Sequence, residues 1–415
     1  MSDLWRHRGF LRLWGGQTLS QFGDRISELA LPLIAVTLLH ASTAEVAALT
    51  ALVWGPNLLA ILLGAWVDQQ RRKRRLMVFA DLTRAVALAT LPVAYLLGTV
   101  TLGHLYLVAV ATGIAGVLFN TAYASFFARL VPRGSYLDAN SKLGASRSVS
   151  QVAGPAAGGG LVQLLTAPIA LLADSLTFLL SALLIGRIHI EEPEPALAAG
   201  TRPSMLNRAR EGLRYVVGHP VLRASLGCCT TVNFFTFIAY GLTVLFASRD
   251  LGLSAGAIGL AFGVGAIGSV LGAVLAPRIS RWIGVGPTIA TGVVLFAAPI
   301  AVIAIAGGPV WARIGALAVA EFVSGFGVML LDVNLNSLQT SVVPDDMRSR
   351  VSGAFSTVNY GVRPLGALVG GVLGTYAGMR PSLLIAAVGG TLSVGWLLAS
   401  PIVRIRTLDA LLLPS

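Results

Sequence analysis

Charged residues are scarce in this chain. Asp, Glu, Lys and Arg make up 12% of its 415 residues, whereas 55% are hydrophobic and the mean hydropathy is +0.79. A soluble domain carries roughly 25% charged residues, so this composition excludes a surface that faces water throughout. The apolar residues recur in blocks of about 20, the length that a helix needs to cross a hydrocarbon core about 30 Å thick. The sequence therefore predicts an integral membrane protein.

Lysine, histidine and cysteine are also rare, and their scarcity excludes several classes of chemistry. The only lysines are Lys73 and Lys142, and neither follows a glycine, so the chain has no phosphate-binding G-K-[ST] loop and is not an ATP-driven pump. The five histidines fall in predicted loops or at span ends, without the spacing of metal ligands on a helix. We therefore expect no enzyme, no cofactor and no metal site. The adjacent Cys228 and Cys229 lie in an apolar segment, where neighbouring residues rarely form a disulfide.

Twelve apolar blocks are predicted to be transmembrane helices, and one long polar segment separates the first six from the last six. This segment, residues 189–220, is rich in Pro, Ala and charge, which predicts a cytoplasmic linker with a short amphipathic helix. We expect an N-terminal six-helix bundle over 1–188 and a C-terminal one over 221–415. The predicted spans are 11–39, 44–67, 76–98, 104–131, 140–165, 168–188, 221–247, 254–276, 283–306, 312–342, 349–377 and 381–403.

The cations fix the expected orientation. A net charge of +12 would suggest nucleic-acid binding in a soluble protein, but this chain has no soluble module that could bind it. Most arginines instead fall in segments on one side of the predicted membrane, and Lys and Arg accumulate on the cytoplasmic side. We expect both termini in the cytoplasm, no nucleic-acid partner and no removable signal peptide. No sequence feature predicts an oligomer, and we expect a monomer in the bilayer.

Short matches between the halves indicate an internal duplication. A Val-Pro pair ends a long apolar helix at 131–132 and again at 343–344, and the same count from each pair reaches three glycines. Two parallel six-helix repeats place a cavity at their interface near the bilayer midplane in transporters. The matched glycines are Gly154, Gly158 and Gly159 in the first half and Gly366, Gly370 and Gly371 in the second.

The stretch GAWVDQQRRKRRLM (64–77), between the second and third spans, resembles the G-x-x-x-D-(R/K)-x-G-R-(R/K) signature of the major facilitator superfamily. Three further stretches are similar to its exporter branch of macrolide-efflux and enterobactin-exporter proteins: SQFGDRISELALPL (20–33), ADSLTF (173–178) and VRPLGALVGG (362–371). The resemblance covers the whole chain. It implies an all-α membrane protein with twelve transmembrane helices in two pseudo-symmetric bundles, located in a bacterial inner membrane.

The same signature implies a gate on the cytoplasmic side. Gly64 would allow close helix contact, and Asp68 would face the positive N-terminal end of a helix in the other half. Arg72 and Lys73 are expected to pair with Asp81 in the third span. The second glycine of the signature is replaced by Arg71, which leaves the turn geometry open. The alternative interpretation is a simple positive-inside anchor, which accounts for most of the cations.

Ionisable residues within the spans are costly and usually functional. In the first span, Gln17, Gln21, Asp24 and Glu28 share one helical face, and Arg25 can reach Glu28. Desolvation favours the protonated form of a carboxyl group, so a proton is the natural coupling ion. The alternative is a neutralised pair of Arg25 with either acid that only holds the first helix in place. Further candidates in the later spans are Asp174, Glu321, Asp332, Asn336 and Arg363.

The fifth span carries SQVAGPAAGGGLV (150–162), which resembles the antiporter motif of the exporter branch. Gly154 and Gly158 form a small-xxx-small pair for tight helix packing, continued by Gly159, and Pro155 can bend the helix. Ordinary close packing would need the same residues. The direction of transport is implied by the resemblance alone.

The combined features predict a secondary transporter of a small molecule. The leading hypothesis is proton-coupled export of hydrophobic or amphipathic compounds, such as antibiotics or drugs, by alternating access. The alternatives are export or flipping of a native molecule such as a siderophore or lysolipid, and uptake of a nutrient. A channel fits duplicated bundles with intramembrane acids less well.

Overall fold

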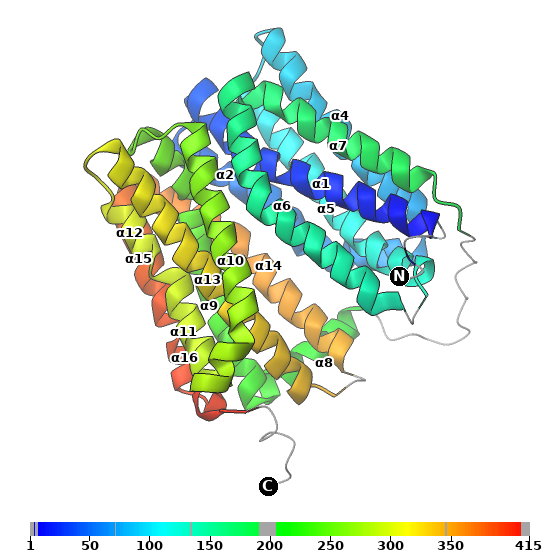
Figure 1. Cartoon of the computed structure of the whole chain (residues 1–415), viewed down its shortest axis with the longest axis vertical. Helices are drawn as coiled ribbons and strands as arrows, with labels where there is room; N and C mark the ends of the chain where they lie inside the picture. Colours follow the sequence, from blue (N-terminus) through cyan, green and yellow to red (C-terminus); the bar gives the residue numbers. More distant parts are fainter. Residues whose placement is uncertain are drawn as a thin grey trace. The chain divides into compact units, whose positions relative to one another are not determined.

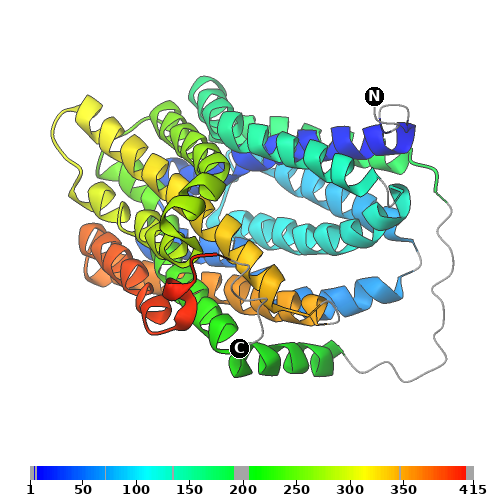
Figure 2. The same ribbon diagram turned by 60° about the horizontal axis from the view of Figure 1, so that its bottom comes forward.

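The computed structural model describes residues 4, 7–70, 72–132, 135–190, 205–344 and 347–407, and all regular structure within them is helical (Figures 1 and 2). The first half contains α1 (Arg8–Leu33), α2 (Thr43–Trp54), α3 (Ala60–Gln69), α4 (Lys73–Leu96), α5 (Leu102–Leu130), α6 (Tyr136–Leu165) and α7 (Ala167–Gly186). The second half contains α9 (Pro220–Arg249), α10 (Ala255–Ile283), α11 (Val285–Ala297), α12 (Ile300–Ile305), α13 (Val310–Val342), α14 (Arg348–Tyr376), α15 (Met379–Leu392) and α16 (Gly395–Leu398). Between the halves, α8 (Met205–Gly218) lies within the predicted linker.

Each of the twelve predicted spans coincides with a helical stretch. By length and composition, eight stretches of the described residues are apolar enough to cross a membrane: α4, α5, α7, α9, α10, α11 with α12, α13, and α15 with α16. The other four are α1, α6, α14 and the interrupted run from α2 to α3, which a 3-10 turn at Gly55–Leu59 breaks. The polar residues that lower the hydropathy of α1 and α14 include the candidate site residues of the sequence, such as Asp24 and Arg363.

The chain divides into two compact units. One contains Met1–Ala41, Leu52–Thr201 and Ser254–Gly263, and the other contains Ser42–Ala51, Arg202–Leu253 and Val264–Ser415. Two helices, α2 and α10, therefore contribute residues to both units. The division at a single linker, with bundles over 1–188 and 221–415, stays a prediction.

The pairing of helices follows the predicted duplication. In the first unit, α1 packs against α6 and α7, and α4 packs against α5 and α7. In the second unit, α9 packs against α14 and α15, and α11 packs against α13 and α15. The first set of contacts becomes the second when α1 is matched with α9, α4 with α11, α5 with α13, α6 with α14 and α7 with α15. The repeat seen in short sequence matches is thus a repeat of packing.

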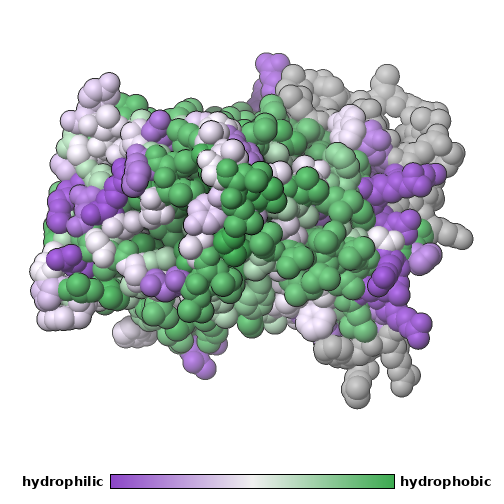
Figure 3. All heavy atoms as spheres, turned by 90° about the horizontal axis from the view of Figure 1, so that it is seen from above, coloured by the Kyte–Doolittle hydropathy of each residue, from purple (hydrophilic) through white to green (hydrophobic). Residues whose placement is uncertain are grey.

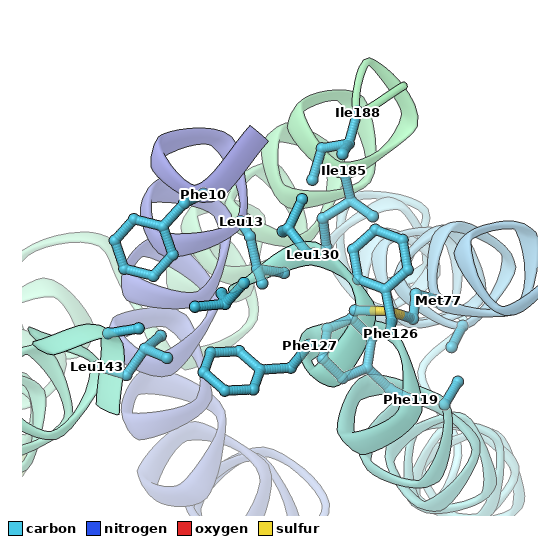
Figure 4. Packing of buried hydrophobic residues seen from close by; sticks show 14 of the residues in the cluster. Phe10, Leu13, Met77, Phe119, Phe126, Phe127, Leu130, Leu143, Ile185 and Ile188 are labelled. Atoms are coloured by element: carbon cyan, nitrogen blue, oxygen red, sulfur yellow. The ribbon is translucent and has the colours of Figure 1, made fainter. Parts of the chain in front are cut away.

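A hydrophobic core joins α1, α3, α4, α5, α6 and α7 of the first unit. Phe10 and Leu13 of α1, Met77 of α4, Phe126 of α5 and Ile185 of α7 are all buried and converge in one cluster (Figure 4). Large apolar side chains are also exposed on the outer faces of the helices, and hydrophobic residues cover most of the face shown in Figure 3. An apolar exterior over helices of this length is the surface that a bilayer covers.

Glycines on α6 bring neighbouring helices into backbone contact. A Cβ at Gly158 would lie 3.1 Å from the Cα of Ile26 on α1, and a Cβ at Gly159 would lie 2.8 Å from the Cα of Gly259 on α10. Helices in lipid associate through close van der Waals packing, because lipid chains are as apolar as the side chains. These glycines therefore position α1, which carries the candidates Asp24 and Glu28.

The matched glycines of α14 make the equivalent contacts in the second unit. A Cβ at Gly370 would lie 3.0 Å from the Cα of Ile238 on α9, and a Cβ at Gly371 would lie 2.5 Å from the Cβ of Ala47 on α2. In each repeat, one glycine thus meets the first helix of its half, and the adjacent glycine meets a second helix. The predicted correspondence of the glycines is reproduced in their contacts.

We expect Gly158→Val to lower the apparent melting temperature of the purified protein, because the branched side chain forces α6 away from α1. Overpacking of this kind costs on the order of 1–3 kcal/mol. The matched control is Gly160→Val on the same helix, where a Cβ meets no atom within 4 Å. Thermal unfolding in detergent checks the pair, and equal losses in both variants would contradict the close approach.

Candidate functional site

Polar residues on α1 form the first part of the candidate site. The Nε2 atom of Gln21 donates a hydrogen bond of 3.3 Å to Oε1 of Gln17, one turn earlier. Arg25 forms an ion pair with Glu28, with 2.6 Å between Nη1 and Oε2, and both side chains are partly exposed. Asp24 is half-buried between these two groups. The pair of Arg25 and Glu28 has the geometry that the sequence spacing allows.

Asp174 of α7 lies at the contact between α7 and α1. Its carboxylate accepts hydrogen bonds from Ser27 of α1 and from Oγ1 of Thr177, the latter at 3.2 Å, and the residue is completely buried. Gly23 on α1 makes room for it, because a Cβ there would collide with the carboxylate and with Thr177. Asp174 is therefore tied to α1 through the hydroxyl of Ser27, and it bonds to Thr177 within α7.

Asp81 of α4 makes a different contact from the one expected. Its Oδ2 accepts a 2.7 Å hydrogen bond from Ser181 of α7, and its buried Oδ1 has no hydrogen-bond partner. The expected pairing of Asp81 with Arg72 or Lys73 is therefore wrong: among the described residues, Asp81 bonds to Ser181, and Lys73 bonds to Val67. Asp81 lies about two turns further along α4 than these cations. At 1.5 Å per residue, this places it about 12 Å from Lys73 along the helix axis.

Arg84 is the residue that the sequence reasoning missed. Its charge acts on three acidic side chains, Asp24, Asp81 and Asp174. The guanidinium also lies over two rings, with Cζ 4.9 Å from the centroid of Phe178 and 5.6 Å from that of Phe119. The spacing Asp81-x-x-Arg84 in an apolar span was the available signal, because residues three apart share a helical face.

The charges around Arg84 do not balance. The charge of Arg25 also acts on Asp24 and Glu28, so two cations serve the four carboxyl groups of Asp24, Glu28, Asp81 and Asp174. Complete ionisation would leave excess negative charge inside the helix bundle. Uncompensated buried charge costs several kcal/mol per ion. A cluster with more acids than bases in such a place is therefore suited to holding protons.

The predicted gating motif lies where α3 meets α4. Gly64 is buried, and a Cβ there would meet Cγ2 of Thr121 on α5 at 3.7 Å, an ordinary contact distance. Lys73 is buried and donates a hydrogen bond to the carbonyl oxygen of Val67, whereas Arg72 is exposed. Asp68 belongs to α3, but its side chain and Arg71 lie outside the described residues.

A second cation, Arg363 of α14, organises the polar residues of the second unit. Its Nε donates a 3.2 Å hydrogen bond to Oδ1 of Asn233 on α9. Its Cζ lies 4.4 Å from the ring centroid of Tyr360 and 4.9 Å from that of Phe237. The charge of Arg363 also acts on Asp332 of α13. The structure thus places two of the predicted residues, Asp332 and Arg363, within electrostatic reach of each other.

The remaining candidates of α13 lie apart from this group. Glu321 packs where α13 meets α10, and a Cβ at Gly265 would lie 2.9 Å from the Cβ of Glu321. Asn336 is exposed and lines an open polar depression of about 450 Å³ together with Ser337, Thr340 and Ser341. The three candidates on α13, Glu321, Asp332 and Asn336, therefore lie in three separate environments.

Sequence comparison gives one family and several relatives. The description of the Major Facilitator Superfamily matches residues 13–367, and it matches again over residues 228–409. The multidrug efflux pump Tap of Mycolicibacterium fortuitum is 28% identical over 379 residues, which cover 87% of this chain and 88% of Tap. The uncharacterized MFS-type transporter YfiS of Bacillus subtilis is 24% identical over 392 residues, which cover 91% of this chain and 89% of YfiS.

Structural comparison supports the same fold. The crystal structure of the nucleoside transporter NupG matches with a TM-score of 0.72 and covers 98% of this chain and 100% of NupG. The two sequences are 14% identical, so this likeness concerns the arrangement of helices and not the substrate.

We expect Arg84→Gln to destabilise the protein by on the order of 3 kcal/mol, because it removes the cation from a cluster of buried acids. Thermal unfolding in detergent measures the loss. Asp174→Asn removes one negative charge and keeps the side-chain shape, so it should be milder and should restore part of the stability in the double variant. The exposed Arg72→Gln is the control for a lost charge, and an Arg84→Gln variant as stable as this control would contradict the assignment.

Proposed function

We propose that this chain, which belongs to the Major Facilitator Superfamily and is a secondary transporter rather than an enzyme, exports hydrophobic or amphipathic compounds such as drugs in exchange for protons. The proposed mechanism is alternating access, in which the substrate site opens to one side of the membrane at a time. The protein acts as a multi-pass component of a bacterial inner membrane, with both termini in the cytoplasm.

The similarity to Tap supports export of drugs. Tap is named as a multidrug efflux pump, and the match extends over most of both chains. The exporter-like stretches of the sequence fall on α1, α7 and α14, the helices that carry Asp24, Asp174 and Arg363. Resemblance and site chemistry thus concern the same helices.

The acid-rich cluster around Arg84 is the observation that carries proton coupling. The charge of Arg84 acts on Asp24, Asp81 and Asp174, and that of Arg25 acts on Asp24 and Glu28, so four acids have two cations. Uptake of a proton lowers the excess negative charge, and its release restores that charge. A transporter that alternates between the two states obtains its driving force from the proton gradient.

Gating in this proposal occurs at the turn between α3 and α4. Lys73 anchors the start of α4 to the end of α3 through the carbonyl of Val67. Asp68 would then interact with the positive end of a helix dipole and hold the cytoplasmic side closed. The exposed cations of this segment keep it on the cytoplasmic side.

Asp24→Asn and Glu28→Gln should uncouple substrate movement from the pH gradient while leaving exchange intact, because neither amide takes up a proton. Reconstitution into liposomes with an imposed gradient, using dyes and macrolides as substrates, tests this. A gradient of one pH unit supports about tenfold accumulation of substrate for each coupled proton. In the variants, the substrate should only reach equal concentrations on both sides of the membrane.

The control for the two coupling variants is Glu211→Gln, which removes a carboxylate from α8, where it pairs with Arg350 at 3.0 Å. It should accumulate substrate like the parent. If Asp24→Asn and Glu28→Gln also transport uphill like the parent, these two acids do not couple transport to protons.

Asp68→Asn should shift the protein toward states that are open to the cytoplasm, because the amide interacts more weakly with a helix dipole. Single cysteines placed on the periplasmic side report this shift as slower labelling. The Arg72→Gln variant is the control for loss of a charge in the same turn. Unchanged labelling in Asp68→Asn would count against the gate.

A further inference from the structure

One tyrosine on α9 is exposed although the rest of that helix segment is enclosed. Among residues 224–248, all of which the structure describes, only Tyr240 is exposed, with 46% of its surface accessible. The helix is covered on its other faces by its neighbours, which include α14 and α15. Tyr240 is therefore accessible on a helix whose other side chains in this segment are enclosed.

A second tyrosine, Tyr360 on α14, is also exposed. The lipid-facing stripe of α14 is formed by large exposed residues at helical spacing, Leu365, Leu368, Val369, Val372 and Tyr376. With about 100° of rotation per residue, these residues lie about 80–180° around the helix from Tyr360. It continues a row of exposed small residues, Ser352, Gly353 and Ser356. Tyr360, 40% exposed, therefore faces away from lipid.

Arg363 connects the two tyrosines through a series of ring contacts. The guanidinium lies against Tyr360 at 4.4 Å and against Phe237 at 4.9 Å, and the ring of Phe237 stacks on that of Tyr240 with 5.1 Å between centroids. Asn233 holds the guanidinium in place, because its Oδ1 accepts from Nε of Arg363 and its Nδ2 donates to the carbonyl of Cys229 at 2.9 Å. The cation and the rings form one preorganised platform on α9 and α14.

We propose that Tyr240, Tyr360 and Arg363 form a recognition site for planar aromatic compounds that carry an acidic oxygen, such as a carboxylate or phenolate. This inference rests on the proposed transport function and specifies its substrate class. The exposed rings offer faces on which an aromatic compound stacks, and the guanidinium supplies the positive charge for its oxygen.

The charge around the platform limits the ligand to a small negative charge. Asp332 on α13 interacts with Arg363 and offsets part of its positive charge. A phosphorylated compound with several negative charges would be repelled by Asp332. A flat aromatic compound with one or two weakly acidic groups fits both the rings and the charge.

Binding of two planar dyes to the full-length protein in nanodiscs tests the proposal. Fluorescein carries acidic oxygens and ethidium is a cation, and fluorescence anisotropy measures both without a pH gradient. Fluorescein should bind saturably. Its affinity should fall at least about fivefold in Tyr240→Leu, in Tyr360→Leu and in Arg363→Gln, as expected for a lost stacking or cation–π contact. Ethidium binding should not fall in Arg363→Gln.

Tyr376→Leu is the matched control, because Tyr376 lies on the lipid-facing stripe of the same helix and is 87% exposed. It should bind fluorescein like the parent. Arg363→Lys should retain part of the affinity, since it keeps the charge and loses the planar group. If Arg363→Gln unfolds, the fluorescein affinities of Tyr240→Leu and Tyr360→Leu test the proposal instead.

The proposal is overturned if fluorescein does not saturate, or if Tyr376→Leu weakens it as much as Tyr240→Leu and Tyr360→Leu do. It is also overturned if Arg363→Gln weakens ethidium as strongly as fluorescein. These outcomes are independent of coupling. Normal fluorescein binding in a protein that fails to accumulate substrate against a pH gradient would refute the proposed proton exchange and leave the recognition site in place.

Discussion

The attraction between Arg84 and the acids around it is the interaction on which the first unit depends. The guanidinium of α4 faces carboxyl groups from α1, α4 and α7, and two phenylalanine rings lie against it. The three helices that carry the acids also pack directly on one another through α7. In the proposed mechanism, a charge placed at this junction stabilises the contact and, because the acids outnumber the cations Arg84 and Arg25, makes the junction respond to protons. Stability and coupling would then share one set of residues.

Glycine makes this arrangement possible. Gly23 leaves space for the carboxylate of Asp174, and Gly116 on α5 leaves space for the guanidinium of Arg84, where a Cβ would lie 2.7 Å from Nη2. The glycines of α6 and α14 likewise leave space for the backbones of the helices packed against them. In lipid, where burial of apolar groups gives little preference for one helix contact over another, such close approaches fix which helices meet.

The sequence predicted the fold better than the site. Apolar blocks located all twelve helical stretches, and the glycines at 154, 158 and 159 predicted the contacts that their counterparts at 366, 370 and 371 repeat. At the site, spacing along α1 was sufficient for the pair of Arg25 and Glu28, which lie three residues apart. It was not sufficient for Asp81, which was assigned to nearby cations and instead contacts Ser181, 100 residues later. Arg84 was overlooked because its importance appears only when α1 and α7 are packed against α4.

The sequence by itself determined that the chain lies in a membrane, that it is duplicated and that its acids gather on few helices. Each of these properties follows from composition or from the spacing of residues along one helix, because local geometry depends on the order of residues. Only the tertiary structure decided which acid meets which base, and which tyrosines of α9 and α14 are exposed. Contacts between helices depend on rotation and depth of each helix, and these are set by packing partners far away in the chain.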